Sequence, residues 1–135
     1  MLGARRVLIV EDNALNLELL ATVLEGAGFD VVTAPDAHGG LEMARTLNPD
    51  VVLMDVQLPE VDGLEATRAL RADPATARIP VIAVTAHVKK DDEERCLQAG
   101  CVRHVPKPID TRALPEIVAT VIAESEAKRR DARPA

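Results

Sequence analysis

The sequence has almost no aromatic residues. It contains no Trp and no Tyr, and Phe29 is its single Phe, although hydrophobic residues make up 47% of the 135 positions. The interior therefore has to be built from Leu, Val, Ile and Ala. Aromatic surfaces on which single-stranded nucleic acids could stack are missing as well. Because the net charge is −6 and no basic stripe is present, direct binding to nucleic acid is not expected.

Long apolar segments and metal-type cysteine patterns are also absent. No apolar stretch is long enough to cross a bilayer, and the start, Met1–Arg6, lacks the apolar region of a signal peptide. The two cysteines, Cys96 and Cys101, have no metal-type spacing to a histidine, so we expect reduced thiols that pack in the interior. These absences predict a cytoplasmic protein without membrane insertion, and its length fits one domain.

Short aliphatic runs alternate with segments of helical periodicity. The runs predict strands near residues 6–11, 30–34, 51–55, 80–85 and 102–105. Near-continuous apolar strands separated by helices are typical of a parallel sheet that is covered on both faces. Right-handed crossovers then favour the strand order 2-1-3-4-5. The predicted fold is a single α/β domain, a doubly wound five-stranded parallel sheet with five helices.

Several residues mark the predicted helices. Asn13 and Asp36 are good N-caps for the first two helices, and Pro49 closes the second. The apolar side of the first helix includes Leu15, Leu19, Leu20 and Leu24.

The last two helices differ in character. The fourth, near residues 89–98, is highly charged and buries few side chains. The last has the clearest helical period, with apolar residues at Leu114, Ile117, Val118, Val121 and Ile122. Periodicity is lost afterwards, so we expect a domain over residues 1–125 and a charged, disordered tail over 126–135.

Polar side chains follow four of the predicted strands. They comprise three acids, one hydroxyl and one amine: Glu11, Asp12, Asp55, Thr85 and Lys107. The carboxyl ends of parallel strands meet at one edge of an open sheet, where such folds place their ligands. We therefore expect these groups to gather there. Lys107 precedes Pro108, and the bond between them could be cis or trans.

Three neighbouring carboxylates repel one another, so either one takes up a proton or the group holds a cation. Oxygen ligands without His or Cys favour Mg²⁺. A phosphoryl group at this edge would find its oxygens neutralised by Mg²⁺, by the Lys107 ammonium and by the Thr85 hydroxyl. Asp55 would then be the nucleophile that forms an acyl phosphate.

These motifs together resemble the receiver domain of bacterial two-component response regulators. The matching stretches are residues 7–13, 53–59, 62–65, 83–86 and 106–108. Residues 11–16, 57–59 and 92–95 are most similar to the single-domain, DivK-like receivers and to receivers attached to hybrid kinases. The resemblance implies a flavodoxin-like fold and a two-component phosphoprotein.

The resemblance also implies roles for the acids. Asp55 would be the phosphoacceptor, which takes its phosphoryl group from a phosphohistidine. Asp12, Asp55 and the backbone carbonyl of Gln57 would ligate Mg²⁺ directly, and Glu11 would act through water. The donor would be a sensor histidine kinase or a histidine phosphotransfer protein. The protein would be a signalling protein in a phosphorelay or in kinase control rather than an enzyme, with slow self-dephosphorylation.

Further roles follow from the same resemblance. Thr85 and Lys107 would bind the phosphoryl oxygens, and Gln57 and His87 would flank the path of the hydrolytic water. The family usually has Tyr or Phe three residues before the lysine, as a ring that swings inward together with the threonine. Here that residue is His104, which could gain a proton near neutral pH and make the switch pH-sensitive. The alternative is an ordinary half-exposed strand histidine.

Output would pass through contacts with a downstream protein effector, because only a short tail follows the last helix. A homodimer through the face formed by the last strand and its flanking helices is left open.

Three rival functions are disfavoured. A phosphatase of the haloacid-dehalogenase type needs a second Asp where this chain has Gln57. A receiver-like module that binds partners without phosphorylation usually lacks one of the acids, the threonine or the lysine, and all are present here. A nucleotide-binding domain would carry a Gly-rich loop after the first strand, which is missing.

Overall fold

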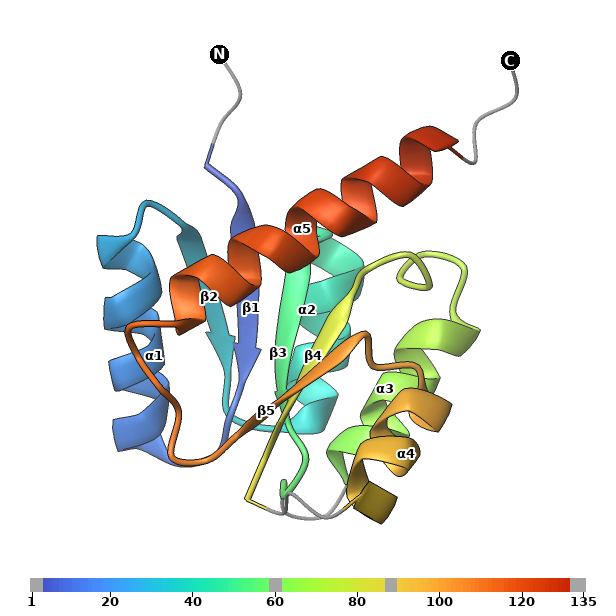
Figure 1. Cartoon of the computed structure of the whole chain (residues 1–135). Coiled ribbons are helices and arrows are strands. Elements are labelled where there is room, and N and C mark those ends of the chain that lie inside the picture. The colour runs from blue at the N-terminus through green and yellow to red at the C-terminus, as the bar shows by residue number, and fades with distance from the viewer. Residues whose placement is uncertain (1–3, 59–61, 87–89, 132–135) are drawn as a thin grey trace.

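The structure, a computed structural model, describes residues 4–58, 62–86 and 90–131, with only the backbone of residues 90–92. Over these ranges, five parallel strands alternate with five helices, and the strand order is β2-β1-β3-β4-β5 (Figure 1). The strands are β1 (Arg6–Val10), β2 (Asp30–Ala34), β3 (Val51–Asp55), β4 (Val81–Thr85) and β5 (Arg103–Pro106). The helices are α1 (Ala14–Gly26), α2 (Ala37–Leu47), α3 (Gly63–Ala72), α4 (Lys90–Ala99) and α5 (Leu114–Asp131). The predicted fold and strand order are confirmed.

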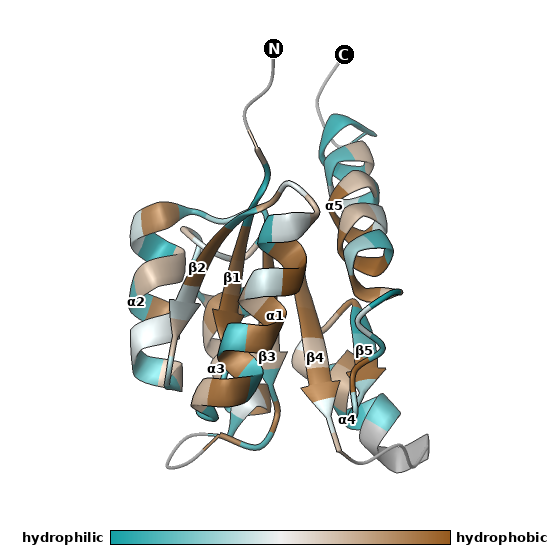
Figure 2. Cartoon of the chain, turned by 90° about the vertical axis from the view of Figure 1, so that its left-hand side faces the viewer, coloured by the Kyte–Doolittle hydropathy of each residue, from teal (hydrophilic) through white to brown (hydrophobic). Residues whose placement is uncertain are grey.

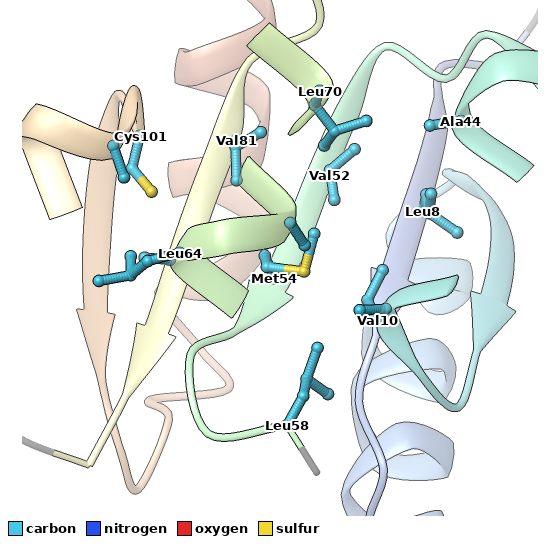
Figure 3. Packing of buried hydrophobic residues seen from close by; sticks show 14 of the residues in the cluster. Leu8, Val10, Ala44, Val52, Met54, Leu58, Leu64, Leu70, Val81 and Cys101 are labelled. Carbon is cyan, nitrogen blue, oxygen red and sulfur yellow. The ribbon is translucent and has the colours of Figure 1, made fainter. Parts of the chain in front are cut away.

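The sheet separates two apolar layers. Helices α1 and α5 cover one face, and α2, α3 and α4 cover the other (Figure 1). Alternate residues of β1 serve the two layers, since Val7 and Ile9 face α1 and α5, whereas Leu8 and Val10 face the other side (Figure 3). Burial on both faces explains why β1 and β4 are hydrophobic along most of their length (Figure 2).

The predicted helix caps are present. The side chain of Asn13 accepts a hydrogen bond from the Asn16 N–H at 3.0 Å, and Asp36 accepts one from the Gly39 N–H at 2.7 Å. Each bond satisfies a backbone donor that the first helical turn leaves unpaired. These caps fix where α1 and α2 start, and α1 begins directly after the end of β1, which carries part of the candidate site.

The C-terminal boundary differs from the sequence expectation. A disordered tail was expected from residue 126, whereas residues 126–131 continue α5. Glu126 forms an ion pair with Arg5 at 3.2 Å. The last turn carries Lys128, Arg129 and Arg130, whose positive charges complement the helix dipole. Helix-forming residues therefore extend α5 beyond its apolar stripe, and residues 132–135 lie outside the described ranges.

The cysteines are packing residues. Cys96 and Cys101 are both buried thiols, and burial raises the pKa of the Cys101 thiol to about 11. A thiol with so high a pKa is a poor nucleophile near neutral pH. Separately, no helix within the described residues combines the length and apolarity needed to span a membrane.

Candidate functional site

Three carboxylates converge at the carboxyl edge of the sheet. Glu11 follows β1 and Asp55 ends β3, and these strands are neighbours with Val10 in register with Met54. One carboxylate oxygen from each of Glu11, Asp12 and Asp55 lies within 4.8 Å of the others. Glu11 and Asp55 are buried, whereas Asp12 is exposed. The predicted gathering of the three acids is confirmed.

Lys107 follows the edge strand β5, and its side chain reaches back to the acids. Its backbone N–H donates to the carbonyl of Thr85 at 2.8 Å, which ties the end of β5 to the end of β4. The ammonium Nζ lies 3.2 Å from Asp55 Oδ1 and 4.0 Å from Glu11 Oε1. The bond to Pro108 is cis. One cation therefore faces both buried carboxylates.

Hydrogen bonds and the close approach of α3 fix the backbone around Asp55. The Gln57 N–H donates to Asp55 Oδ1 at 2.9 Å, and the Val56 N–H donates to the Val84 carbonyl at 3.0 Å. Gly63, the first residue of α3, has no space for a side chain, since a Cβ there would lie 2.1 Å from the Asp55 carbonyl oxygen. Glycine at this position lets α3 approach the acceptor backbone directly.

The pKa values of the two buried carboxylates are shifted in opposite directions. Burial, followed by the hydrogen bond and negative charge of Asp55, raises the pKa of Glu11 to about 7, against the opposing effect of Lys107. Burial alone would raise the pKa of Asp55 too. Hydrogen bonds from protonated Glu11, the Gln57 N–H and the Lys107 ammonium outweigh it and lower that pKa below its ordinary value. Without a metal, Glu11 therefore holds a proton below about pH 7, whereas Asp55 is ionised.

The donor set fits a hard divalent cation. It consists of oxygens alone, from three carboxylates. Glu11 Oε2 is buried and has no hydrogen-bond partner within the described part of the chain. A buried oxygen without a partner costs free energy unless a proton, water or cation satisfies it. Magnesium, which binds one or two carboxylates and keeps its remaining waters, matches this arrangement.

The remaining predicted site residues of this edge are Thr85, Gln57 and His87. Thr85 is buried at the end of β4, one strand from Asp55, which is in register with Val84. Gln57 has an exposed side chain beside the acceptor. His87 lies outside the described residues, so its position is not tested.

His104 has a partner that the sequence did not indicate. It lies on β5, in register with Ala83, and its side chain is 28% exposed. Its Nε2 lies 3.1 Å from Oε1 of Glu93 on α4. The half-exposed position agrees with the sequence expectation. The carboxylate partner was missed because α4 carries several acids, and the sequence does not show which of them faces His104.

Helix α1 presents apolar side chains next to the site. Leu20 is buried against the sheet, whereas Leu15 is 77% and Leu19 51% exposed. The apolar stripe seen in the sequence is thus wider than the face that the sheet covers. Leu19 lines a cavity of about 380 Å³ that also borders Glu11 and Lys107. An apolar surface of this kind beside a reactive site is typical of a docking surface.

Comparisons with known proteins agree with this geometry. A family model described as the response regulator receiver domain matches residues 7–119. The polar-differentiation response regulator DivK of Brucella ovis is 44% identical over 117 residues, which are 87% of this chain and 93% of DivK. A putative response regulator from Chloroflexus aurantiacus superposes with a TM-score of 0.85 at 29% identity, over 90% of this chain and 99% of that chain. The receiver domain of the sensor histidine kinase PA1611 from Pseudomonas aeruginosa, with magnesium coordinated in its active-site cleft, gives 0.82 at 35% identity and the same coverage of 90% and 99%.

Proposed function

The chain belongs to the response regulator receiver domains of two-component systems, and on this premise we propose that it accepts a phosphoryl group from a phosphohistidine on Asp55. The observation that carries the proposal is the environment of that carboxylate. Asp55 is buried, ionised and within 3.2 Å of the Lys107 ammonium, and two further acids lie beside it. An ionised carboxylate beside fixed positive charge is suited to attack a phosphoryl group.

In the proposed reaction, an Asp55 oxygen forms a bond to phosphorus while the N–P bond of the donor breaks. The donor imidazole leaves and takes up a proton. Lys107 neutralises one phosphoryl oxygen and Thr85 donates to another, while the Gln57 N–H orients the acceptor. Bound Mg²⁺ would supply the remaining charge neutralisation, held by Asp12, Asp55 and the Gln57 carbonyl, with Glu11 acting through water.

The phosphoryl group on Asp55 would be lost by hydrolysis. Water attacks the phosphorus in line, the bond to the Asp55 oxygen breaks, and inorganic phosphate leaves. Gln57 and His87 are proposed to flank the path of that water and to set a slow rate. The chain would then act as a phosphorelay or kinase-control protein rather than as a dedicated enzyme.

We place the donor, a sensor histidine kinase or a histidine phosphotransfer protein, on the exposed face of α1. Leu15 and Leu19 supply its apolar contact beside the acid cluster. Output would pass to a protein effector, with Thr85 and His104 as the switch residues. The proposed compartment is the cytoplasm. A phosphorylation-independent binding module is the alternative function.

Intact-mass measurement tests the proposal. The protein is incubated with Mg²⁺ and acetyl phosphate, beside Asp55→Asn and the control Asp30→Asn at the opposite end of the sheet. We expect one phosphoryl group on the wild type and on Asp30→Asn, and none on Asp55→Asn. If no adduct appears, beryllofluoride binding shows whether rapid hydrolysis hides it. Absence of both would favour the binding module.

A further inference from the structure

A second cavity lies at the end of the sheet opposite Asp55. Its volume is about 360 Å³, and it borders Pro80 and Val102, which precede β4 and β5. Its other wall is the C-terminal half of α5, which continues past that end of the sheet (Figure 1). A volume of this size lies within the range of about 300–1,000 Å³ that is common for small-molecule sites.

The charge of this cavity is opposite to that of the chain. The whole sequence has a net charge of −6, yet among the described residues that line the cavity five are basic and only Glu124 is acidic. The basic residues come from three separate parts of the chain: Arg71, Arg78, Arg103, Lys128 and Arg129. Like charges brought together from distant segments repel one another unless an anion joins them.

Two of the five cations have structural partners. Arg71 donates from Nη2 to the carbonyl of Gly100 at 2.7 Å, and Arg103 pairs with Glu124 at 3.6 Å. For Arg78, Lys128 and Arg129, no hydrogen bond or ion pair is found within the part of the chain that the structure describes. Three cations therefore border the cavity with their donors available.

An apolar surface lies beside these cations. Val121 and Pro80 are buried, whereas Val102 is 44% exposed and supplies the accessible part of this surface. An apolar patch next to guanidinium groups is suited to the ring of a ligand, because guanidinium groups also stack on ring planes. Inorganic anions alone would leave this patch exposed to water.

The α5 wall lies outside the part of the chain that matches the receiver family. The match ends at residue 119, whereas Val121, Glu124, Ser125, Lys128 and Arg129 follow it. Helix-dipole compensation accounts for Lys128 and Arg129 on α5, but not for Arg78 on the loop before β4 or for the exposed Val102.

We propose that this cavity binds a small phosphorylated molecule with an aromatic ring, of the nucleotide class. Arg78, Lys128 and Arg129 would bind its phosphate groups, and Val102 with Pro80 would contact its ring. The site is separate from the carboxyl edge of the sheet, where the missing Gly-rich loop disfavours nucleotide binding.

Calorimetric titration of the full chain tests the proposal, with ATP, inorganic triphosphate and adenosine as probes. Chelator is present throughout, so that metal at the acid cluster cannot recruit phosphate. We expect ATP to bind about tenfold more tightly than triphosphate or adenosine, because only ATP uses both the cations and the apolar patch. Equal affinity for ATP and triphosphate, equal affinity for ATP and adenosine, or no binding of ATP would each overturn the proposal.

Two matched variants locate the binding. Arg129→Glu reverses a charge at the cavity, and Arg130→Glu reverses the neighbouring charge in the same helical turn, outside the cavity lining. We expect Arg129→Glu to weaken ATP binding about tenfold or more and Arg130→Glu to change it less than about threefold. Equal losses in both variants would show a general charge effect and overturn the site. Amide shifts of Val102 and Val121 in the titration provide a readout that does not depend on folding differences.

Discussion

His104 Nε2 lies 3.1 Å from Glu93 Oε1, and this contact joins β5 to α4. Both side chains are partly exposed, at 28% and 42%, which limits the strength of the pair.

Glu93→Gln should therefore lower the free energy of unfolding by at most about 0.2–1 kcal/mol. Urea unfolding measures this, with Glu94→Gln as the control. An equal effect of Glu94→Gln would contradict a specific pair between His104 and Glu93.

For the switch itself, His104→Tyr should remove any pH dependence of effector affinity. Unchanged affinity and pH dependence would leave His104 as an ordinary strand residue.

Glu11 should make the metal-free protein less stable as pH rises. Its pKa is raised to about 7 in the fold, whereas the unfolded chain releases that proton near 4.5. The folded state thus binds more protons between these values, and the free energy of unfolding falls as pH rises through this window. We expect the free energy of unfolding to fall by about 1–2 kcal/mol over this window. This is less than the full pKa shift of Glu11 implies, because Glu11 and Asp55 titrate as a coupled pair.

Urea unfolding in chelator, from about pH 4.5 to pH 8, measures that slope. Glu11→Gln should flatten it, and Mg²⁺ should stabilise the wild type more at the upper end, where Glu11 is ionised. Asp55, with its lowered pKa, contributes stability that is lost only at more acidic pH. A wild-type slope that persists in Glu11→Gln would assign the titration to another group.

Gly63→Ala should damage both stability and phosphorylation. The added Cβ would lie 2.1 Å from the Asp55 carbonyl oxygen, so α3 or the acceptor backbone has to move. We expect a loss of about 2 kcal/mol or more in unfolding free energy, together with slower phosphoryl uptake. At Gly26, near the end of α1, a Cβ would meet nothing within 4 Å. Gly26→Ala should be neutral or stabilise by up to about 1 kcal/mol. Similar effects at the two glycines would exclude the steric explanation.

Leu19→Asp should slow phosphoryl transfer from a protein donor but not from a small-molecule donor. The side chain is 51% exposed beside the acid cluster, so stability should change little. Transfer from a phosphorylated histidine phosphotransfer domain should slow by about tenfold or more, whereas uptake from acetyl phosphate should be unchanged. Leu97→Asp on α4, with a 61% exposed side chain, serves as the matched control. Slower uptake from both donors would indicate damage to the acid cluster itself.

The residues at the carboxyl edge of the sheet could be predicted from the sequence because the patterns that mark them are local. Four of the five strands end in, or are followed directly by, a residue of the candidate site, and parallel topology alone brings Glu11 close to Asp55. The cap at Asn13 is equally local. Such features depend on spacing along the chain and on one rule of sheet geometry.

Features that depend on contacts between distant segments were not predictable in this way. The Glu93 partner of His104 and the basic cavity both require knowing which helix face turns toward which strand. The extension of α5 to Asp131 was missed because loss of apolar periodicity was interpreted as loss of helix. Polar helix-forming residues and the ion pair between Glu126 and Arg5 support those turns instead.

All five residues of β3, from Val51 to Asp55, are buried, with strands on both sides and helices on both faces. Central strands of this kind exchange their amide hydrogens only through the largest openings of the fold. The phosphoacceptor is thus attached to the last element to open, while the peripheral helices can fray and close again. Spontaneous local unfolding would leave Asp55 in place. The lifetime of a phosphorylated chain should therefore depend on the chemistry of the acyl phosphate and not on local opening and closing of the protein.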